Sequence, residues 1–140
     1  MITAIEFRRH LHRHPELSFQ EVHTAEYIEQ CLTEAGIDHS RIANTGVLAK
    51  IEGRGDIKRA VVLRADIDAL PIQECTDLEY ASQRVGVMHA CGHDMHTAML
   101  LASCHDVSVE KAKLAALMHD CAKKMKDKDS VKLCEKYHVE

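Results

Sequence analysis

The sequence predicts an α/β fold in which a partial, parallel-rich sheet is flanked by helices and followed by an all-helical C-terminal tail. Apolar residues recur at helical spacing in residues 3–35, and a continuous apolar run opens residues 60–72. A continuous run is typical of a strand that is covered on both faces, as in a parallel sheet between helices. The tail is predicted from the helical, lysine-rich pattern of residues 109–137.

Two helices are expected before the first strand. Residues 3–14 show helical spacing, and Pro15 cannot continue that helix. Ser18 and Glu21 have the spacing of a capping box, in which each side chain bonds the backbone amide of the other residue, so we expect a second helix to begin there. Gly36 is expected to end it. The predicted buried stripe of the second helix comprises Val22, Ala25, Ile28, Leu32 and Ala35.

Strands are expected in residues 45–53, where apolar side chains alternate with others, and at the start of residues 60–72. The second strand leads to Asp66 and Asp68. Functional groups of open α/β sheets gather at the carboxyl ends of strands, which favours a functional role for both carboxylates. The alternative is that they are turn-forming aspartates before Pro71.

The run GVMHACGHDMHTAMLL, residues 86–101, is the strongest functional signal in the sequence. Thiol, imidazole and carboxylate side chains in close succession are the ligand types of a transition-metal site, and Gly92 allows the backbone to bend between them. The alternative is a reduced structural cysteine beside ordinary histidines. A helix is expected from about His93 to Cys104. The possible ligands in this run are His89, Cys91, His93, Asp94 and His96.

Composition excludes several classes of function. The formal net charge of −4 provides no basic surface for nucleic acid. No apolar run approaches the roughly 18 residues of a membrane span, and the N-terminus is too charged for a signal peptide. The six cysteines show no disulfide-scaffold spacing. We therefore expect reduced thiols in a cytoplasmic protein without nucleic-acid or membrane partners.

Composition also divides the chain. All six glycines, both prolines and all eight arginines lie at or before Gly92, whereas eight of the ten lysines lie at or after Lys111. So sharp a change of residue usage predicts two segments of different origin, residues 1–101 and 102–140.

Residues 1–101 resemble the N-terminal part of the zinc aminoacylase and carboxypeptidase clan. The closest resemblance is to the N-acyl-amino-acid amidohydrolases, which include hippurate hydrolase and auxin-conjugate hydrolase. Four motifs occur in the family's order: RRHLHRHPELSFQE at residues 8–21, TGV at 45–47, LRADIDALPI at 63–72, and the run at 86–101.

The resemblance implies a role for each residue of the predicted site. Cys91 and His93 would bind zinc or manganese, with Asp66 counted among the metal-site residues. Asp68 would be the catalytic-site carboxylate that orients a ligand. Two divalent ions would polarise the amide carbonyl of an N-acyl amino acid and supply hydroxide, with a glutamate as general base.

The 140 residues lack part of the family pattern. They contain no Glu-Glu pair after the metal motif, and two protein ligands hold a catalytic metal poorly. We therefore expect impaired hydrolysis, and the alternative is an inactive remnant that at most binds metal. The family's sheet gains strands from sequence not present here, so an exposed sheet edge would favour homo-oligomer formation.

Residues 102–140 resemble a second family, the HD-domain phosphohydrolases that split dinucleoside tetraphosphates. The resemblance rests on HDVSVEKAKLAALMHDCAKKM, in which His119 and Asp120 would be the HD pair and would bind a metal such as iron. It implies an alternative function as a metal-dependent phosphohydrolase. Without the resemblance, these two residues form an ordinary pair on a helix.

Overall fold

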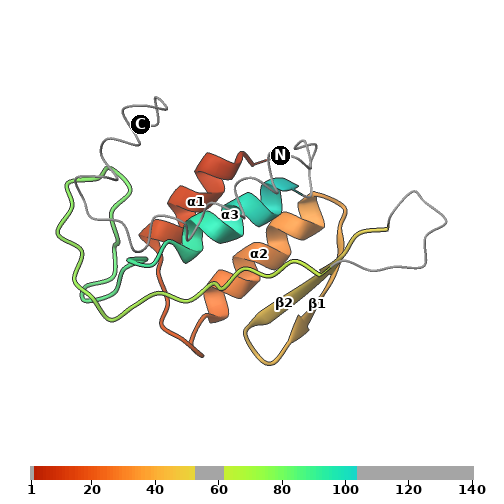
Figure 1. Cartoon of the computed structure of the whole chain (residues 1–140), viewed down its shortest axis with the longest axis horizontal. Coiled ribbons are helices and arrows are strands. Elements are labelled where there is room, and N and C mark those ends of the chain that lie inside the picture. Colours follow the sequence, from red (N-terminus) through yellow and green to blue (C-terminus); the bar gives the residue numbers. More distant parts are fainter. Residues whose placement is uncertain (1, 53–61, 104–140) are drawn as a thin grey trace, which may run out of the picture. The chain divides into compact units, whose positions relative to one another are not determined.

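A computed structural model describes residues 2–52 and 62–103. The chain divides into two units, Met1–Val107 and Ser108–Glu140, and every described residue belongs to the first. The predicted tail helices, His119 and Asp120 therefore lie outside the described residues. The elements shown in Figure 1 are α1 (Ala4–Arg13), α2 (Val22–Glu34), β1 (Asp38–Ile42), β2 (Gly46–Lys50) and α3 (His93–Ser103).

Helix α1 begins at a capping box that the sequence analysis did not identify. The Glu6 amide donates to Thr3 Oγ1 at 3.2 Å, and the Thr3 amide donates to Glu6 Oε2 at 2.9 Å. The helix ends at Arg13, before Pro15, as predicted. The predicted first helix is therefore confirmed, and its start is fixed by a local exchange of two hydrogen bonds.

Replacing Thr3 with alanine is expected to lower the free energy of unfolding by about 1 kcal/mol, because the Glu6 amide then loses its side-chain acceptor. Urea denaturation would measure the change. Ser18→Ala is the matched control, since Ser18 is an exposed residue that caps no helix. An equal loss in both variants would contradict this assignment of the cap.

The predicted start of the second helix is wrong. Residues 17–20 form a turn in which the Gln20 amide donates to the Leu17 carbonyl at 2.9 Å, and Phe19 has a φ of 64°. This turn removes Ser18 from the helix, and α2 begins at Val22 without a side-chain bond from its N-cap residue. The buried Glu16 carboxylate instead accepts the Thr24 amide at 2.8 Å, which satisfies one free amide of the first turn.

Three helices share one hydrophobic core. Gly36, with a φ of 69°, follows α2 as predicted. Of the predicted α2 stripe, Val22 is exposed and Ala35 half-buried, whereas the other three residues are buried. The core cluster comprises Phe7 and Leu11 of α1, Ile28, Cys31 and Leu32 of α2, and Ala98 and Leu101 of α3. Because α3 packs on α1, the predicted metal-binding run is carried by an element that is fixed to the core.

The sheet of the described residues is a two-stranded antiparallel hairpin, not the predicted parallel-rich sheet. Strand β2 lies within the predicted residues 45–53 and pairs with β1, from Asp38 opposite Lys50 to Ile42 opposite Gly46. The alternating pattern did not predict burial, because Ala49 and Ile51 are exposed. Strand β1 was missed because its sequence, DHSRI, is mostly polar.

The predicted strand at the start of residues 60–72 is not formed in its described part. Residues 62–68 adopt no regular structure, and Val62 and Leu63 are 84% and 63% exposed. A strand needs a neighbour along its length, and the described residues offer this segment only isolated bridges, Leu17 with Ala69 and Leu70 with Met88. The described apolar residues of the run, Val62 and Leu63, therefore stay on the surface.

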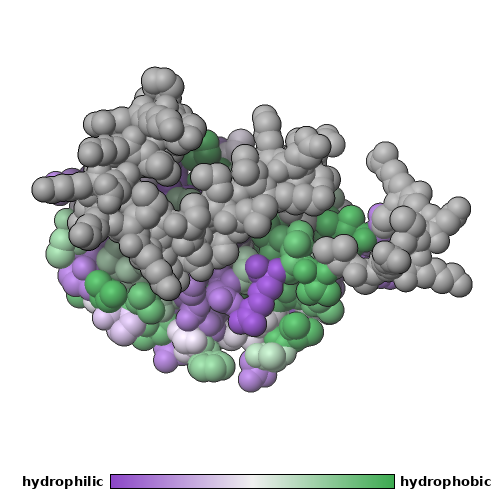
Figure 2. All heavy atoms as spheres, viewed as in Figure 1, coloured by the Kyte–Doolittle hydropathy of each residue, from purple (hydrophilic) through white to green (hydrophobic). Residues whose placement is uncertain are grey.

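On the face shown in Figure 2, apolar and polar side chains both lie where the hairpin lies in Figure 1. Exposed side chains in and beside the hairpin include Ile42, Leu48 and Ile51. None of the helices in residues 2–52 and 62–103 has the length and hydropathy needed to cross a membrane.

Candidate metal centre

The predicted metal-binding run forms a turn that leads into α3. Gly92 has a φ of 86°, a conformation that residues with a Cβ atom rarely adopt. Its carbonyl accepts the amides of Met95 and His96 at 3.0 and 3.1 Å, which closes the first turn of the helix. The turn therefore places Cys91 just before α3 and His93 at its first position. The predicted helix is confirmed over its described residues, His93–Ser103.

Asp68 holds the ring of His93. The Nδ1 atom of His93 lies 2.8 Å from Asp68 Oδ1 and 3.0 Å from the Asp68 carbonyl oxygen. Both side chains are partly buried. Since both neighbours of Nδ1 are acceptors, Nδ1 donates the hydrogen and Nε2 is the nitrogen that can bind a metal. A histidine oriented by a carboxylate in this way is typical of metal sites.

The other predicted site residues are less closely grouped. Cys91 is exposed. The carboxylate of Asp66 pairs with Arg64 at 2.8 Å, whereas its main-chain oxygen accepts the Thr97 hydroxyl at 3.1 Å. Within residues 2–52 and 62–103, no three His, Cys, Asp or Glu side chains converge on a common metal position. The structure thus brings His93 to Asp68 and does not complete a set of three ligands.

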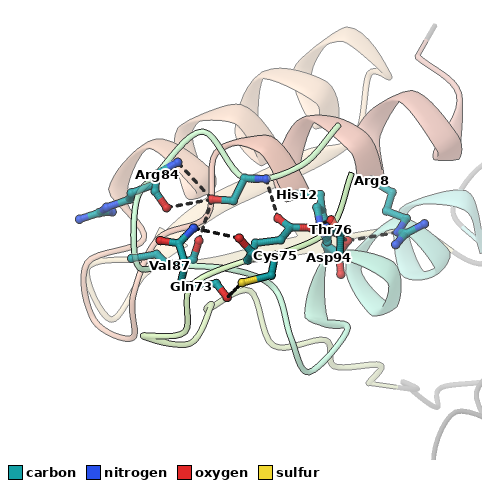
Figure 3. Close-up of polar contacts among 10 residues, drawn as sticks. Arg8, His12, Gln73, Cys75, Thr76, Arg84, Val87 and Asp94 are labelled. Carbon is teal, nitrogen blue, oxygen red and sulfur yellow. Dashed lines mark hydrogen bonds and ion pairs between the residues drawn. The ribbon is translucent and has the colours of Figure 1, made fainter. Parts of the chain in front are cut away.

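Asp94, next to His93, anchors the start of α3 to α1. It is 1% exposed. Its Oδ2 atom accepts hydrogen bonds from His12 Nδ1 at 2.8 Å and from Arg8 Nε at 3.1 Å. Figure 3 shows Asp94 between Arg8 and His12. Neither α1 partner was predicted from the sequence, although their spacing of four residues places them on one face of the helix.

Glu74 binds the other nitrogen of His12. Its Oε1 atom lies 3.2 Å from His12 Nε2 and 2.5 Å from the Thr76 hydroxyl, and its Oε2 atom accepts the Ser82 amide at 2.6 Å. Burial opposes ionisation of Glu74, but these three hydrogen bonds together outweigh it and lower its pKa below the usual 4.5. No local pattern indicates this role, since His12 lies 62 residues earlier in the chain.

The lowered pKa of Glu74 predicts a pH-dependent stability. As pH falls, the unfolded chain takes up a proton at this carboxyl near pH 4.5, before the folded chain does. The ionised Glu74 therefore contributes to the free energy of unfolding above that pH, and this contribution is lost as pH falls below it. Urea denaturation at about pH 7 and about pH 4 should show a smaller loss of stability for Glu74→Gln than for the wild type. Glu79→Gln, at an exposed glutamate of the same loop, is the control. Equal losses in the wild type and Glu74→Gln would contradict the prediction.

His89 lies beside this network. It is 5% exposed, and neither ring nitrogen has a hydrogen-bond partner among the described residues. Burial lowers its pKa, although the charge of Asp94 acts in the opposite direction. Neutral imidazole is the form that binds metals.

The residues present fit part of a metal centre. A cysteine thiolate is a soft ligand and an imidazole is a borderline one, and Cys91 and His93 are both set at the turn that starts a packed helix. The Asp68–His93 bond supplies the supporting contact such a ligand usually has. A third ligand is not supplied within the described part of the chain.

The sequence model of Peptidase family M20/M25/M40 matches residues 62–130. An N-acyl-L-amino acid amidohydrolase of Geobacillus stearothermophilus is 54% identical over 101 residues, which are 71% of this chain and 27% of that protein. An N-acetyl-L-cysteine deacetylase of Bacillus subtilis is 55% identical over 100 residues, covering 71% of this chain and 24% of the relative.

Two crystal structures are also similar. The Bacillus subtilis YXEP protein, described as a dinuclear metal-binding peptidase of the M20 family, is 52% identical with a TM-score of 0.68, over 71% of this chain and 28% of that one. A putative aminohydrolase from methicillin-resistant Staphylococcus aureus is 42% identical with a TM-score of 0.68, over 84% of this chain and 29% of the other.

The N-terminal segment is therefore a member of the M20 peptidase family, and relatives of that segment include proteins named N-acyl-L-amino acid amidohydrolase and N-acetyl-L-cysteine deacetylase. The chain spans about a quarter of the length of the curated relatives it matches. The comparisons do not support the predicted HD-domain resemblance. The family match itself continues across His119 and Asp120 to residue 130. A short pattern of helical residues around one His-Asp pair was too weak a signal for that assignment.

Proposed function

We propose that this chain carries the cysteine–histidine part of the metal centre of an amidohydrolase that cleaves N-acyl amino acids. The observation that supports it is the 2.8 Å contact between His93 Nδ1 and Asp68 Oδ1. His93 lies two residues after Cys91. Relatives more than 50% identical over this segment are named for amide-cleaving reactions of N-acyl amino acids.

The residues of this segment would have distinct roles. Cys91 and His93 Nε2 would hold a divalent ion, zinc or manganese, and Asp68 would keep the His93 ring in the orientation that directs Nε2 to it. Such an ion polarises an amide carbonyl and makes a bound water more acidic. Asp66 would remain beside the centre, with its carboxylate paired to Arg64. The substrate would be a small molecule, and homo-oligomer formation and a cytoplasmic location stay predictions from the sequence.

Hydrolysis by the full chain tests this proposal. The substrates are N-acetylcysteine and hippurate, with zinc or manganese added to metal-free protein. We expect slow, metal-dependent release of cysteine or benzoate, because catalytic metal sites normally use three protein ligands and no three such side chains converge in the described part of the chain. His93→Ala should abolish it, and Glu29→Gln, at an ion pair between α2 and β1, should not. Product release that is equal in wild type and His93→Ala would overturn the proposal.

A further inference from the structure

A chain of buried polar side chains leads from the loop at residues 73–82 to the start of α3. Glu74 Oε1 lies 3.2 Å from His12 Nε2, and His12 Nδ1 lies 2.8 Å from Asp94 Oδ2. All three side chains are buried, and they come from the loop, α1 and α3 respectively. This series of contacts therefore ends at Asp94, the residue next to His93.

His12 is held at both ring nitrogens. Each ring nitrogen lies within hydrogen-bond distance of one carboxylate, Nδ1 of Asp94 and Nε2 of Glu74. An imidazole bonded at both edges cannot rotate without breaking one of the two bonds. Its position is further fixed by α1, which contributes Phe7 and Leu11 to the hydrophobic core. A change at Glu74 is therefore transmitted to Asp94 through a rigid ring.

The metal-binding turn is consequently fixed from two sides. Asp68 holds the ring of His93, whereas Arg8 and His12 hold the adjoining Asp94. The first contact sets the rotation of the imidazole about its side-chain bonds. The second sets where the backbone of the turn lies relative to α1. Both are needed for His93 and Cys91 to keep one geometry.

Fold stability alone does not account for this arrangement. Burying several ionisable side chains costs desolvation free energy, and well-packed apolar residues of similar volume are often as stabilising or more so. The neighbouring His89, buried with both nitrogens unpartnered among the described residues, adds to that cost. These buried side chains lead to the turn that carries Cys91 and His93. Their arrangement is better explained by the orientation that they impose on this turn.

We propose that Glu74 and His12 are positioning residues that set the geometry of Cys91 and His93 through Asp94. Through them, the conformation of the loop at residues 73–82 is coupled to the metal-binding turn. The proposal rests on the proposed role of Cys91 and His93 as metal ligands. Neither positioning residue is required to contact metal or substrate.

Cobalt binding to the full chain tests the positioning role. The cobalt spectrum reports the ligand geometry, and the variants are Glu74→Gln and His12→Gln. Outer-shell partners of a ligand typically contribute about 10–100-fold to metal affinity, so for these more remote residues we expect a loss of about tenfold, with shifted cobalt bands. Glu29→Gln, at an ion pair between α2 and β1, should leave affinity and spectrum unchanged. Thr76→Ala, which removes one donor to Glu74, is a milder variant if the others unfold.

Nuclear magnetic resonance of the metal-free chain separates this proposal from the proposed function. Glu74→Gln should shift the imidazole resonances of His93 and the amides of residues 91–96, whereas Glu29→Gln should not. Such shifts without cobalt binding by the wild type would overturn the metal role and leave the positioning role standing. A Glu74→Gln chain with wild-type His93 resonances and a wild-type cobalt spectrum would overturn the positioning role.

Discussion

Replacing Asp94 with alanine is expected to lower the free energy of unfolding by about 3–5 kcal/mol, the usual cost of removing one partner from a buried ion pair. Asp94 is 1% exposed, and its Oδ2 atom is the acceptor for both Arg8 and His12. Without it, His12 keeps a buried nitrogen that has lost its acceptor, and Arg8 loses its buried counter-charge. Leaving such groups unpaired is more costly than losing the attraction itself.

Urea denaturation of the metal-free chain measures this effect. The control is Glu52→Ala, which removes an exposed ion pair with Lys50 and should leave the midpoint essentially unchanged. A midpoint for Asp94→Ala close to that of the wild type would contradict the account of how α3 is held on α1.

The second large effect concerns metal affinity. Cys91→Ser is expected to weaken zinc binding by more than about 100-fold, because an outer-shell partner alone contributes about 10–100-fold and Cys91 is proposed as a direct ligand. Competition with a chromophoric chelator would measure the affinity. Cys75→Ser is a matched control, since Cys75 is also an exposed, free cysteine. Equal affinities for the two variants would remove Cys91 from the proposed ligand set.

Local signals in the sequence predicted where the first two helices end and where the turn before α3 lies. Pro15 and Gly36 end α1 and α2 because one cannot donate a backbone hydrogen bond and the other readily adopts a positive φ. Gly92 marks the turn before α3 for the same reason as Gly36. The contact between Asp68 and His93 was anticipated only through family resemblance, since the two residues are 25 positions apart.

Features that depend on distant partners could not be read from local patterns. The apolar run at residues 60–72 has the composition of a buried strand, but a strand forms only where neighbours pair with it, and the described residues provide isolated bridges. Asp94 is 82 residues from His12, and Glu74 is 62 residues from it. No spacing rule connects these positions, so the buried network became visible only in the folded chain.

The central claim is that Cys91 and His93 bind one divalent ion, with Asp68 orienting the histidine. X-ray absorption spectroscopy of the zinc-loaded full chain tests it most directly. The account predicts one sulfur neighbour at about 2.3 Å and at least one imidazole nitrogen at about 2.0–2.1 Å, with the sulfur absent in Cys91→Ser. A first shell of only oxygen and nitrogen, identical in wild type and Cys91→Ser, would contradict the claim.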